Sequence, residues 1–531
     1  MSARAGWPLV LLLVSAGAVA LPDVFDLDAL KLGLVALLAA VMLLPWMLWR
    51  GRDALAAWLG SRGALLYLAS VAWSLIGALA VLRHAAVADR LLVALLATLA
   101  GALGVLAAWR ARAALRDALL LLGFATAIVA TLQAAGLERW LTSGPDEVVA
   151  LMGNSTRAGA LLALCVAAAI ATLLGPDPRD PAWKLRLAAW VTTLGVAALL
   201  LTRARGGWLA AACGAAAVVA ASRGAPAARW RSLGIHLALG LGLALALGEG
   251  PQRLLASKLD AEAPLLSAQD VTTQVRLSVW RGTLAMAAQR PLDGWGLGRY
   301  REQYPPFRDP AEAALPGLAG AHTEVDHPHD ELLLALAEGG WPAALCLLGF
   351  ALATLARAAR ATRRGGASAP DGGCGDRVAL GVLVAGTVAA LVQNAWVSPG
   401  TALPFFAAAG WAWAPAAPRP AGPRASAVLV AGGLAAMLAL VVLAVPRVRA
   451  QLGMRDFLVR TEAIGKLTPD GFAVLVRAAD ADPGDVDAQR VLLSFGDEIL
   501  QRSPDAGHSV RDPMARARER LAELAPHAPA D

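Results

Sequence analysis

The chain has 531 residues, of which 57% are hydrophobic and only 16% are charged. Soluble domains carry roughly 25% charged residues, so this composition excludes an ordinary soluble protein. The net charge of +7 does not indicate a nucleic-acid binder, because the arginines lie between apolar runs and not on one amphipathic surface with interleaved aromatic residues.

Apolar runs of a length that suits membrane-spanning helices recur along most of the chain. They lie roughly at 7–21, 29–49, 64–82, 91–108, 117–136, 157–175, 187–202, 207–222, 233–248, 331–356, 378–397, 401–415 and 425–445. We therefore expect an all-α fold, a polytopic transmembrane bundle of about 12 or 13 spans. The first run could be a signal peptide, but Leu21-Pro22-Asp23 is a poor cleavage site, so we expect an uncleaved helix.

The connections between these runs alternate in their content of basic residues. If the N-terminus lies inside, one face receives Arg50/Arg52/Arg62, Arg110/Arg112/Arg116, Arg179/Lys184/Arg186, Arg223/Arg229/Arg231, Arg357/Arg360/Arg363/Arg364 and Arg419/Arg424. By the positive-inside rule that face is cytoplasmic. The opposite face has a few basic exceptions, namely Arg83, Arg90, Arg139, Arg157, Arg203 and Arg205.

The same topology predicts two domains. Residues 1–445 form the transmembrane domain, with a large extracytoplasmic loop at about 250–330, and residues 446–531 form a soluble helical segment. A connector longer than about 15 residues is usually functional or disordered, and this loop contains aromatic residues that favour a folded structure. Within it, residues 274–289 predict a short amphipathic helix with Val275, Val279, Leu284 and Met286 on its apolar face.

The C-terminal segment lacks long apolar runs. Residues 472–483, 486–500 and 513–524 predict short helices, and the first two are separated by an Asp-Pro turn. This pattern is typical of tetratricopeptide (TPR)-like packing, although a plain helical cap stays open as the alternative.

Two arginines stand out on the extracytoplasmic face. Arg203 and Arg205 lie in Thr202-Arg-Ala-Arg-Gly-Gly207, between two apolar runs. Guanidinium groups bind phosphate in a bidentate manner, so an anionic ligand would explain them. The alternative is that they extend to the membrane interface beside Trp208.

A second polar motif, His327-Pro-His-Asp-Glu331, opens an apolar helix. Ionisable residues at a membrane boundary indicate function, which makes His329 the leading candidate, with Asp326, His327 and Asp330 beside it. The two acids Asp330 and Glu331 could instead serve the helix N-terminus. A metal site with His322 is not favoured, because His-x-His in an extended proline turn differs from the helical pair of a zinc protease.

The motifs occur in the order found in the O-antigen ligase and polymerase superfamily, which the chain resembles over roughly residues 60 to 415. The matching motifs are Gly153-Asn154, the Thr202–Gly207 arginine motif, Arg276 with Trp280, the Pro291–Gly298 turn, and His327–Leu333 running into Glu338-Gly339. The Gly294–Gly298 part resembles a nucleotide loop only superficially, and we expect a turn that approaches the bilayer.

The resemblance implies a glycosyltransferase of the bacterial inner membrane that is inverting and needs neither metal nor cofactor. Its donor would be a glycan on undecaprenyl diphosphate at the periplasmic face, and its acceptor lipid A-core or another glycan or protein. By position, Arg205 and Arg276 match the essential arginines and His329 the essential histidine. Arg203, His327, Asp326 and Asp330 are expected to bind substrate, and Asp330 stands where relatives commonly have Asn.

Several functions stay open. His329 could be the general base, or a phosphate ligand with Asp330 or Asp326 as the base. Within the superfamily, a ligase, a polymerase and a protein O-oligosaccharyltransferase are all compatible with the motifs. From a different class, intramembrane charges also mark lipid and solute transporters, which commonly show internal repeats that this sequence lacks.

Overall fold

The computed structural model describes residues 6–20, 24, 26–79, 82, 84–138, 148–247, 271–310, 325–365, 371, 373–464, 468–502 and 508–525. Arg83, Arg139, His322 and the first part of the predicted loop, 250–270, lie outside these residues. The described residues form helices and turns and contain no strand, which confirms the all-α prediction.

Every one of the predicted apolar runs falls on a helix of the bundle. These helices are α1 (Trp7–Ala18), α2 (Leu27–Leu38) continued by α3 (Leu44–Trp46) and α4 (Arg52–Leu59), α5 (Arg62–Ile76), α6 (Ala85–Arg110), α7 (Ala114–Ala134), α8 (Ser155–Leu174), α9 (Ala182–Leu201), α10 (Arg205–Ala221), α11 (Ala227–Leu247), α16 (Glu331–Gly365), α17 (Cys374–Gln393), α18 (Pro399–Trp413) and α19 (Pro423–Ile464). Two π-helical segments join α2 to α3 and α3 to α4, so residues 27–59 form one continuous helical span with two π-helical interruptions.

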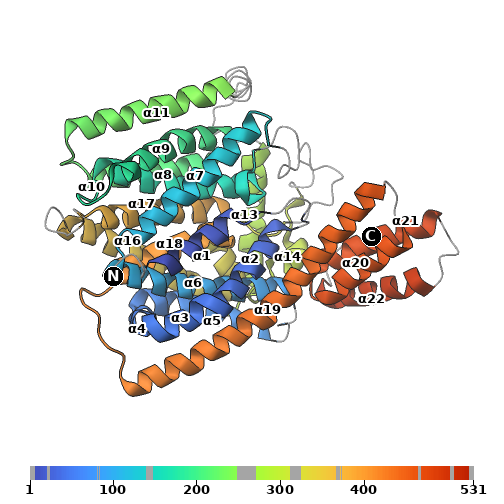
Figure 1. Ribbon diagram of the computed structural model, residues 1–531. Helices are drawn as coiled ribbons and strands as arrows, with labels where there is room; N and C mark the ends of the chain where they lie inside the picture. The colour runs from blue at the N-terminus through green and yellow to red at the C-terminus, as the bar shows by residue number, and fades with distance from the viewer. Residues whose placement is uncertain are drawn as a thin grey trace.

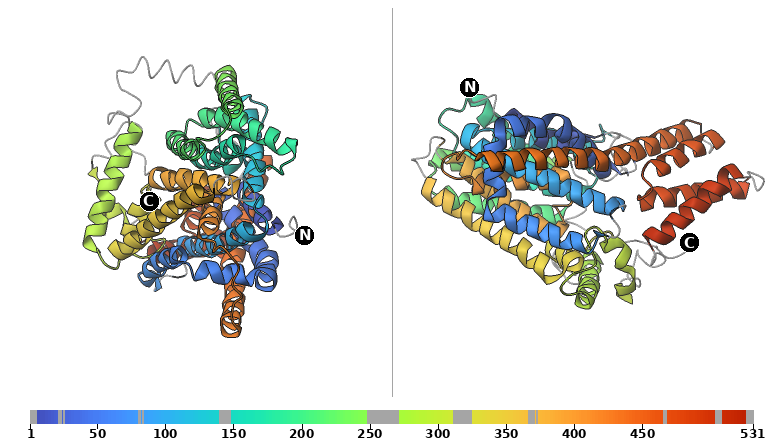
Figure 2. Two further views of the ribbon diagram at one scale, coloured as in Figure 1. Left: turned by 90° about the vertical axis from the view of Figure 1, so that its left-hand side faces the viewer. Right: turned by 90° about the horizontal axis from the view of Figure 1, so that it is seen from below.

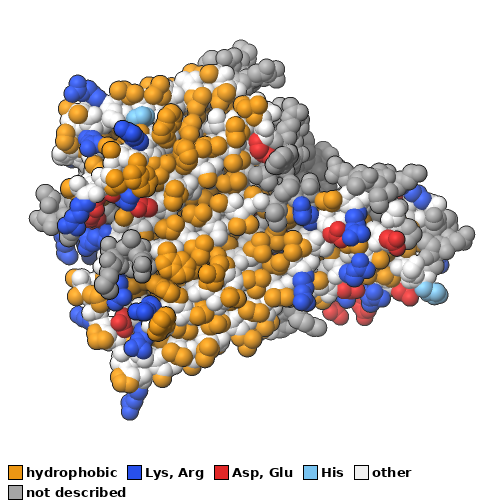
Figure 3. All heavy atoms as spheres, viewed as in Figure 1, with side chains coloured by type: hydrophobic (Ala, Val, Ile, Leu, Met, Phe, Trp, Pro, Cys, Tyr) orange, Lys and Arg blue, Asp and Glu red, His pale blue; other side chains and the backbone are white. Residues whose placement is uncertain are grey.

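The bundle has the surface of a membrane protein. Within the described residues, nine helices are long and apolar enough to cross a bilayer, and α1, α5 and α10 are shorter apolar helices. Figure 3 shows a belt of hydrophobic side chains across the bundle, with Lys and Arg at its left end and mixed charges over the C-terminal helices at its right. The bundle also exposes large apolar side chains such as Trp190, Ile235 and Leu438. Their exposure does not destabilise a membrane protein, because they contact lipid and not water.

Small residues bring the central helices together. α6 and α18 pack through Gly101 and Gly104 on one side and Ala407 and Gly410 on the other. A Cβ at Gly410 would fall on the backbone of Gly101, so no larger residue fits without separating the helices. Membrane helices associate largely by such close backbone packing, since lipid is as apolar as leucine.

The chain leaves the bundle through α19, which passes through the expected domain boundary at 445/446 and continues to Ile464 (Figure 1). Beyond it, α20 (Pro469–Ala481) packs on the last turns of α19, α21 (Val486–Arg502) packs on α20, and α22 (His508–Leu524) packs on α21. Phe457 of α19, Leu475 and Met514 belong to a hydrophobic cluster separate from that of the bundle. The right view of Figure 2 places these helices at one end of the bundle.

The same end of the bundle carries the starts of α2, α6, α8, α10 and α16, and we call it the His329 end. A cavity there is lined by Asp26, Arg157, His327 and Arg447, which come from helix ends far apart in sequence. The opposite end, which carries Arg110 and Lys184, is called the Arg110 end.

Candidate functional site

His329 stands at the start of α16 in a conformation that few residues adopt. Its φ is +57°, in the left-handed region that is uncommon for residues other than glycine. The ring lies edge-on to that of His327, with 4.6 Å between centroids. Among the described residues, the Nδ1 atoms of both rings are buried without a hydrogen-bond partner. Two such imidazoles can receive hydrogen bonds or protons from a ligand.

Asp330 caps the helix that follows. Its Oδ1 accepts hydrogen bonds from the backbone N–H of Leu332 at 2.8 Å and of Leu333 at 3.0 Å. This is the N-cap arrangement that satisfies the free donors of a first helical turn. The helix-terminus alternative of the sequence therefore has a direct structural basis at Asp330. Burial raises the pKa of this carboxyl.

The predicted amphipathic helix of the loop is α13 (Val271–Gln289), and it places Arg276 beside the histidines. Trp280 donates from Nε1 to the carbonyl oxygen of Pro328 at 2.8 Å, directly between His327 and His329. Arg276 precedes Trp280 by four residues and so lies on the same helix face. The expected apolar stripe is wrong at one position: Val279 and Met286 are buried, whereas Leu284 is half exposed.

Positive charge surrounds His329. Burial and the neighbouring guanidinium groups of Arg276 and Arg157 lower its pKa to about 4. Burial, the His329 ring and Arg157 lower the pKa of His327 to about 3. Both rings are therefore neutral near pH 7, and the positive charge beside them is that of the arginines. Such a site favours an anion.

Arg157 is a site residue that the sequence singled out only as a topological exception. It lies in the first turn of α8, where Asn154 caps the helix through Oδ1, and its guanidinium pairs with Asp28 at 2.7 Å. Its charge reaches both histidines. The available signal in the sequence was that Arg157 lies three residues after the helix cap Asn154, on the face of the membrane that the positive-inside rule does not favour for arginine.

The two arginines of the Thr202–Gly207 motif occupy different surroundings. Arg205 is the first residue of α10 and is half-buried, next to Gly206 and Gly207, which pack against Gln393 and Gly159. Arg203 is exposed in the preceding turn, with a left-handed φ of +56°. Arg205 is thus held where α10 packs against its neighbours, whereas Arg203 lies at the surface.

Backbone strain gathers at this end. The non-glycine residues with positive φ in the described part of the chain are Ala150, Arg203, His329 and Asn394. All four lie in turns at the His329 end, before α8, α10 and α16 and after α17. Strained residues of this kind cluster at functional sites, because the surrounding structure must hold them there.

The turn between α17 and α18 adds polar groups that sequence reasoning missed. Gln393, Asn394 and Trp396 are buried there, and side-chain atoms of all three lack a hydrogen-bond partner among the described residues. The backbone N–H of Trp396 donates to Glu331 Oε1 at 2.9 Å, which ties this turn to the start of α16. Polar residues between two apolar runs were the signal, but nothing local separates them from an ordinary turn.

The glycine-rich turn packs against protein. Gly294, Gly296 and Gly298 all have positive φ, and the backbone N–H groups of Trp295 and Gly296 donate to carbonyls of Ala337 and Glu338. Glu338 also accepts from the N–H of Gly298 at 2.9 Å and from Arg90 at 3.3 Å. The expected turn is therefore present, and a break in α16 at Gly340 provides the surface on which it packs.

A cavity of about 230 Å³ opens beside His327. Its walls come from the bundle, the loop and the C-terminal helices, and include Arg90, Arg157, Tyr300, Asp485 and Arg490. Asp326 lies at its edge and pairs with Arg301 at 3.1 Å, and Arg301 also binds Asp487 through two hydrogen bonds of 2.8 and 2.7 Å. The carboxylate of Asp326 is thus already paired with the guanidinium group of Arg301.

The described residues contain no group of three or more His, Cys, Asp or Glu side chains placed to hold a metal ion. His322, the third histidine of the metal alternative, lies outside them.

Fold and site together define a multi-pass membrane protein with partly buried neutral histidines and arginines at one end of its bundle. Residues 187–348 match the family described as O-antigen ligase, which confirms the resemblance of this part of the chain to the O-antigen ligase/polymerase superfamily. The match spans Arg203, Arg205, Arg276, His327 and His329. A comparison with curated proteins finds no significant match.

Proposed function

We propose that the protein is a ligase-type glycosyltransferase of the bacterial inner membrane that transfers a polysaccharide from undecaprenyl diphosphate to lipid A-core or a similar acceptor. The observation that carries the proposal is that the Nδ1 atom of His329 has no hydrogen-bond partner among the described residues, while the charges of Arg276 and Arg157 act on its ring. His329 and Arg276 lie inside the family match, and Arg157 precedes it in the chain. The arginine-poor connections at this end support a periplasmic active site.

In this reaction the acceptor hydroxyl attacks the anomeric carbon of the donor, and the bond from that carbon to the diphosphate oxygen breaks. The electron pair leaves with undecaprenyl diphosphate, whose growing negative charge Arg205 and Arg276 stabilise. The hydroxyl proton passes to neutral His329. Attack opposite the leaving group inverts the anomeric carbon, and no metal or other cofactor takes part.

The other assigned residues would bind substrate. Arg203 at the surface turn suits the carrier, and His327 lies in contact with His329 at the cavity. Asp326 and Asp330 also bind substrate in this proposal, and the ion pair with Arg301 orients Asp326. We also propose that residues 446–531 act as a TPR-like soluble unit beside the transmembrane domain of residues 1–445.

The test is transfer from purified undecaprenyl diphosphate glycan in the presence of EDTA, with His329→Ala, Arg205→Ala and Arg276→Ala. His329→Asn is the sharpest variant, because Asn tolerates a left-handed φ but is not a base near neutral pH. Arg281→Ala is the matched control on α13, since Arg281 is largely exposed. We expect each site variant to lose roughly 100-fold or more in rate and the control to keep it.

Folded wild-type protein that transfers nothing from several donors to several acceptors would contradict the proposal and favour a transporter. Retained activity in His329→Asn would instead exclude the base role. Within the superfamily, a deletion strain separates the functions: unattached long glycan indicates a ligase, single repeats a polymerase, and unglycosylated protein with normal polysaccharide a protein O-oligosaccharyltransferase.

A further inference from the structure

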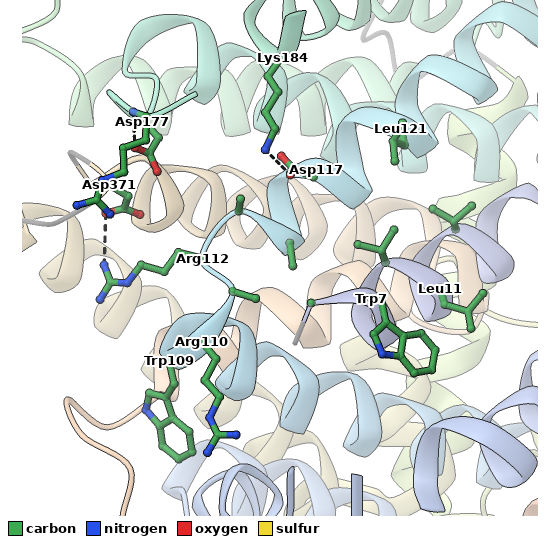
Figure 4. A pocket seen from close by; sticks show the side chains of 17 residues that line it. Trp7, Leu11, Trp109, Arg110, Arg112, Asp117, Leu121, Asp177, Lys184 and Asp371 are labelled. Carbon is green, nitrogen blue, oxygen red and sulfur yellow. Dashed lines mark hydrogen bonds and ion pairs between the residues drawn. The ribbon is translucent and has the colours of Figure 1, made fainter. Parts of the chain in front are cut away.

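A large cavity lies at the Arg110 end, away from the histidines. Its volume is about 1120 Å³, and it is bounded by α1, the turn between α6 and α7, and the turn between α8 and α9 (Figure 4). We propose that it binds an anionic phospholipid, with the phosphate at its basic rim and the start of an acyl chain along α1. This inference concerns a second site and does not rest on the proposed transfer reaction.

One wall of the cavity is an apolar helix face that the bundle covers only in part. Trp7, Val10, Leu11 and Val14 line it, at the i, i+3, i+4, i+7 spacing of a single stripe. The other face of α1, with Leu9, Leu12 and Leu13, is fully buried in the bundle. α1 is thus apolar on both faces, one fully buried and the other only partly covered by protein, with Trp7 against Trp46 and Val10 and Leu11 at the edge of the core.

The stripe runs in the direction that a lipid needs. At about 1.5 Å per residue, Trp7 and Val14 are separated by about 10 Å along α1. Leu121 of α7, which is half exposed, continues the apolar surface one turn beyond Asp117. In Figure 4, Trp7, Leu11 and Leu121 stand on one side of the cavity, while the labelled charged residues stand on the other.

The opposite wall carries more cationic than anionic side chains. It contains Arg110, Arg112, Arg179 and Lys184 together with Asp117, Asp177 and Asp371. Lys184 pairs with Asp117 at 2.6 Å and Arg112 with Asp371 at 3.3 Å. Arg110 and Arg179 are exposed and have no ion pair among the described residues. A bound phosphate would supply the missing negative charge.

The combination of the two walls selects the ligand class. A soluble anion would use the arginines but leave the apolar stripe empty, and a zwitterionic lipid would bring no net charge to them. An anionic phospholipid satisfies both walls. The Arg110 end carries the connections that the positive-inside rule assigns to the cytoplasm, where anionic lipids attract basic residues.

The first experiment uses full-length wild-type protein in nanodiscs with photoactivatable phosphatidylglycerol, the diazirine being placed on the acyl chain. Crosslinking is expected in the α1 peptide around Val10 and Val14, and unlabelled phosphatidylglycerol should compete better than phosphatidylcholine. Crosslinks spread evenly over α11 and α19, with no preference for α1, would overturn the proposal, because they would indicate ordinary annular lipid.

The second experiment measures phosphatidylglycerol retention by native mass spectrometry. Arg110→Gln/Arg179→Gln should bind roughly 10- to 30-fold more weakly, given about 1 kcal/mol for each basic residue near a lipid head group. Arg223→Gln/Arg231→Gln is the control, because both arginines are exposed at the same end and outside the cavity. Equal loss in both pairs would show that general surface charge acts.

The apolar wall is tested separately with Leu11→Ala, which should weaken the lipid but leave any inorganic phosphate signal unchanged. Inorganic phosphate that displaces phosphatidylglycerol at equal concentration would overturn the lipid assignment and indicate a soluble anion site.

Discussion

At the scale of single residues, the charges around His329 determine when it can accept a proton. Its pKa is lowered to about 4 by burial, Arg276 and Arg157, so the free enzyme keeps the ring neutral well below pH 6.5. We expect kcat/KM to fall only as the pH approaches the lowered pKa of about 4. The acid limb of kcat should lie at higher pH, because the bound diphosphate offsets the positive charge of the arginines and so raises the pKa of His329. Arg157→Gln should move the kcat/KM limb upward. Acid limbs near pH 6.5 in the profiles of both kcat/KM and kcat would contradict this prediction.

Asp330 allows the two candidate bases to be separated. Because Asn caps a helix about as well as Asp, Asp330→Asn should keep α16 intact and keep transfer close to wild type if His329 is the base. Asp330→Ala should lose about 1 kcal/mol of stability through the missing cap. Activity assays and thermal melts of the two variants give the answer. Loss of transfer in a fully stable Asp330→Asn protein would assign the base role to Asp330.

At the scale of elements, one hydrogen bond joins the helix of Arg276 to the turn of His329. Trp280→Phe keeps the ring but removes the donor to the Pro328 carbonyl, a bond worth about 1 kcal/mol. We expect a decrease in kcat with little change in the melting temperature, because α13 also packs through Val279 and Met286. Trp183→Phe is the control, since Trp183 is exposed. Unchanged kcat would show that α13 is positioned by its apolar contacts alone.

The packing of α6 on α18 sets how much space the core allows. Gly410→Ala would place a methyl group on the backbone of Gly101 and should destabilise the bundle by about 1–3 kcal/mol. Gly432→Ala in α19 is the matched control, because nothing lies within 4 Å of the position of its Cβ. Thermal unfolding in detergent compares the two. Similar melting temperatures would mean that the helices move apart without cost.

At the scale of the whole molecule, a buried arginine holds the C-terminal helices against the His329 end. Arg447 of α19 donates to Asp89 of α6 and to Asp482 and Asp485 at 3.0 and 2.9 Å. Arg447→Gln should cost about 3–5 kcal/mol, because it leaves buried carboxylates without their partner. Hydrogen exchange of α20–α22 should rise, while Arg449→Gln, at an exposed position of the same helix, should change little. Unchanged protection would mean that the apolar cluster alone suffices.

The sequence by itself determined the membrane class, the positions of the helices and the order of the motifs. These depend on local composition: an apolar run of sufficient length becomes a helix in lipid wherever it packs, because its backbone must satisfy its own hydrogen bonds. For the same reason the helix at 274–289 was predictable. Its buried face was only partly so, since Leu284 is exposed and the partner surface decides which side turns inward.

Only the tertiary structure decided which polar residues share a site. Arg157 joins His329 although the two lie far apart in sequence, because α8 and α16 begin at the same end of the bundle. The Gly294–Gly298 turn rests on α16, because the break at Gly340 exposes backbone that can bind it. The partly covered apolar stripe on α1 could not be recognised in the sequence, since an apolar helix in a membrane protein has the same pattern whether protein or lipid covers it.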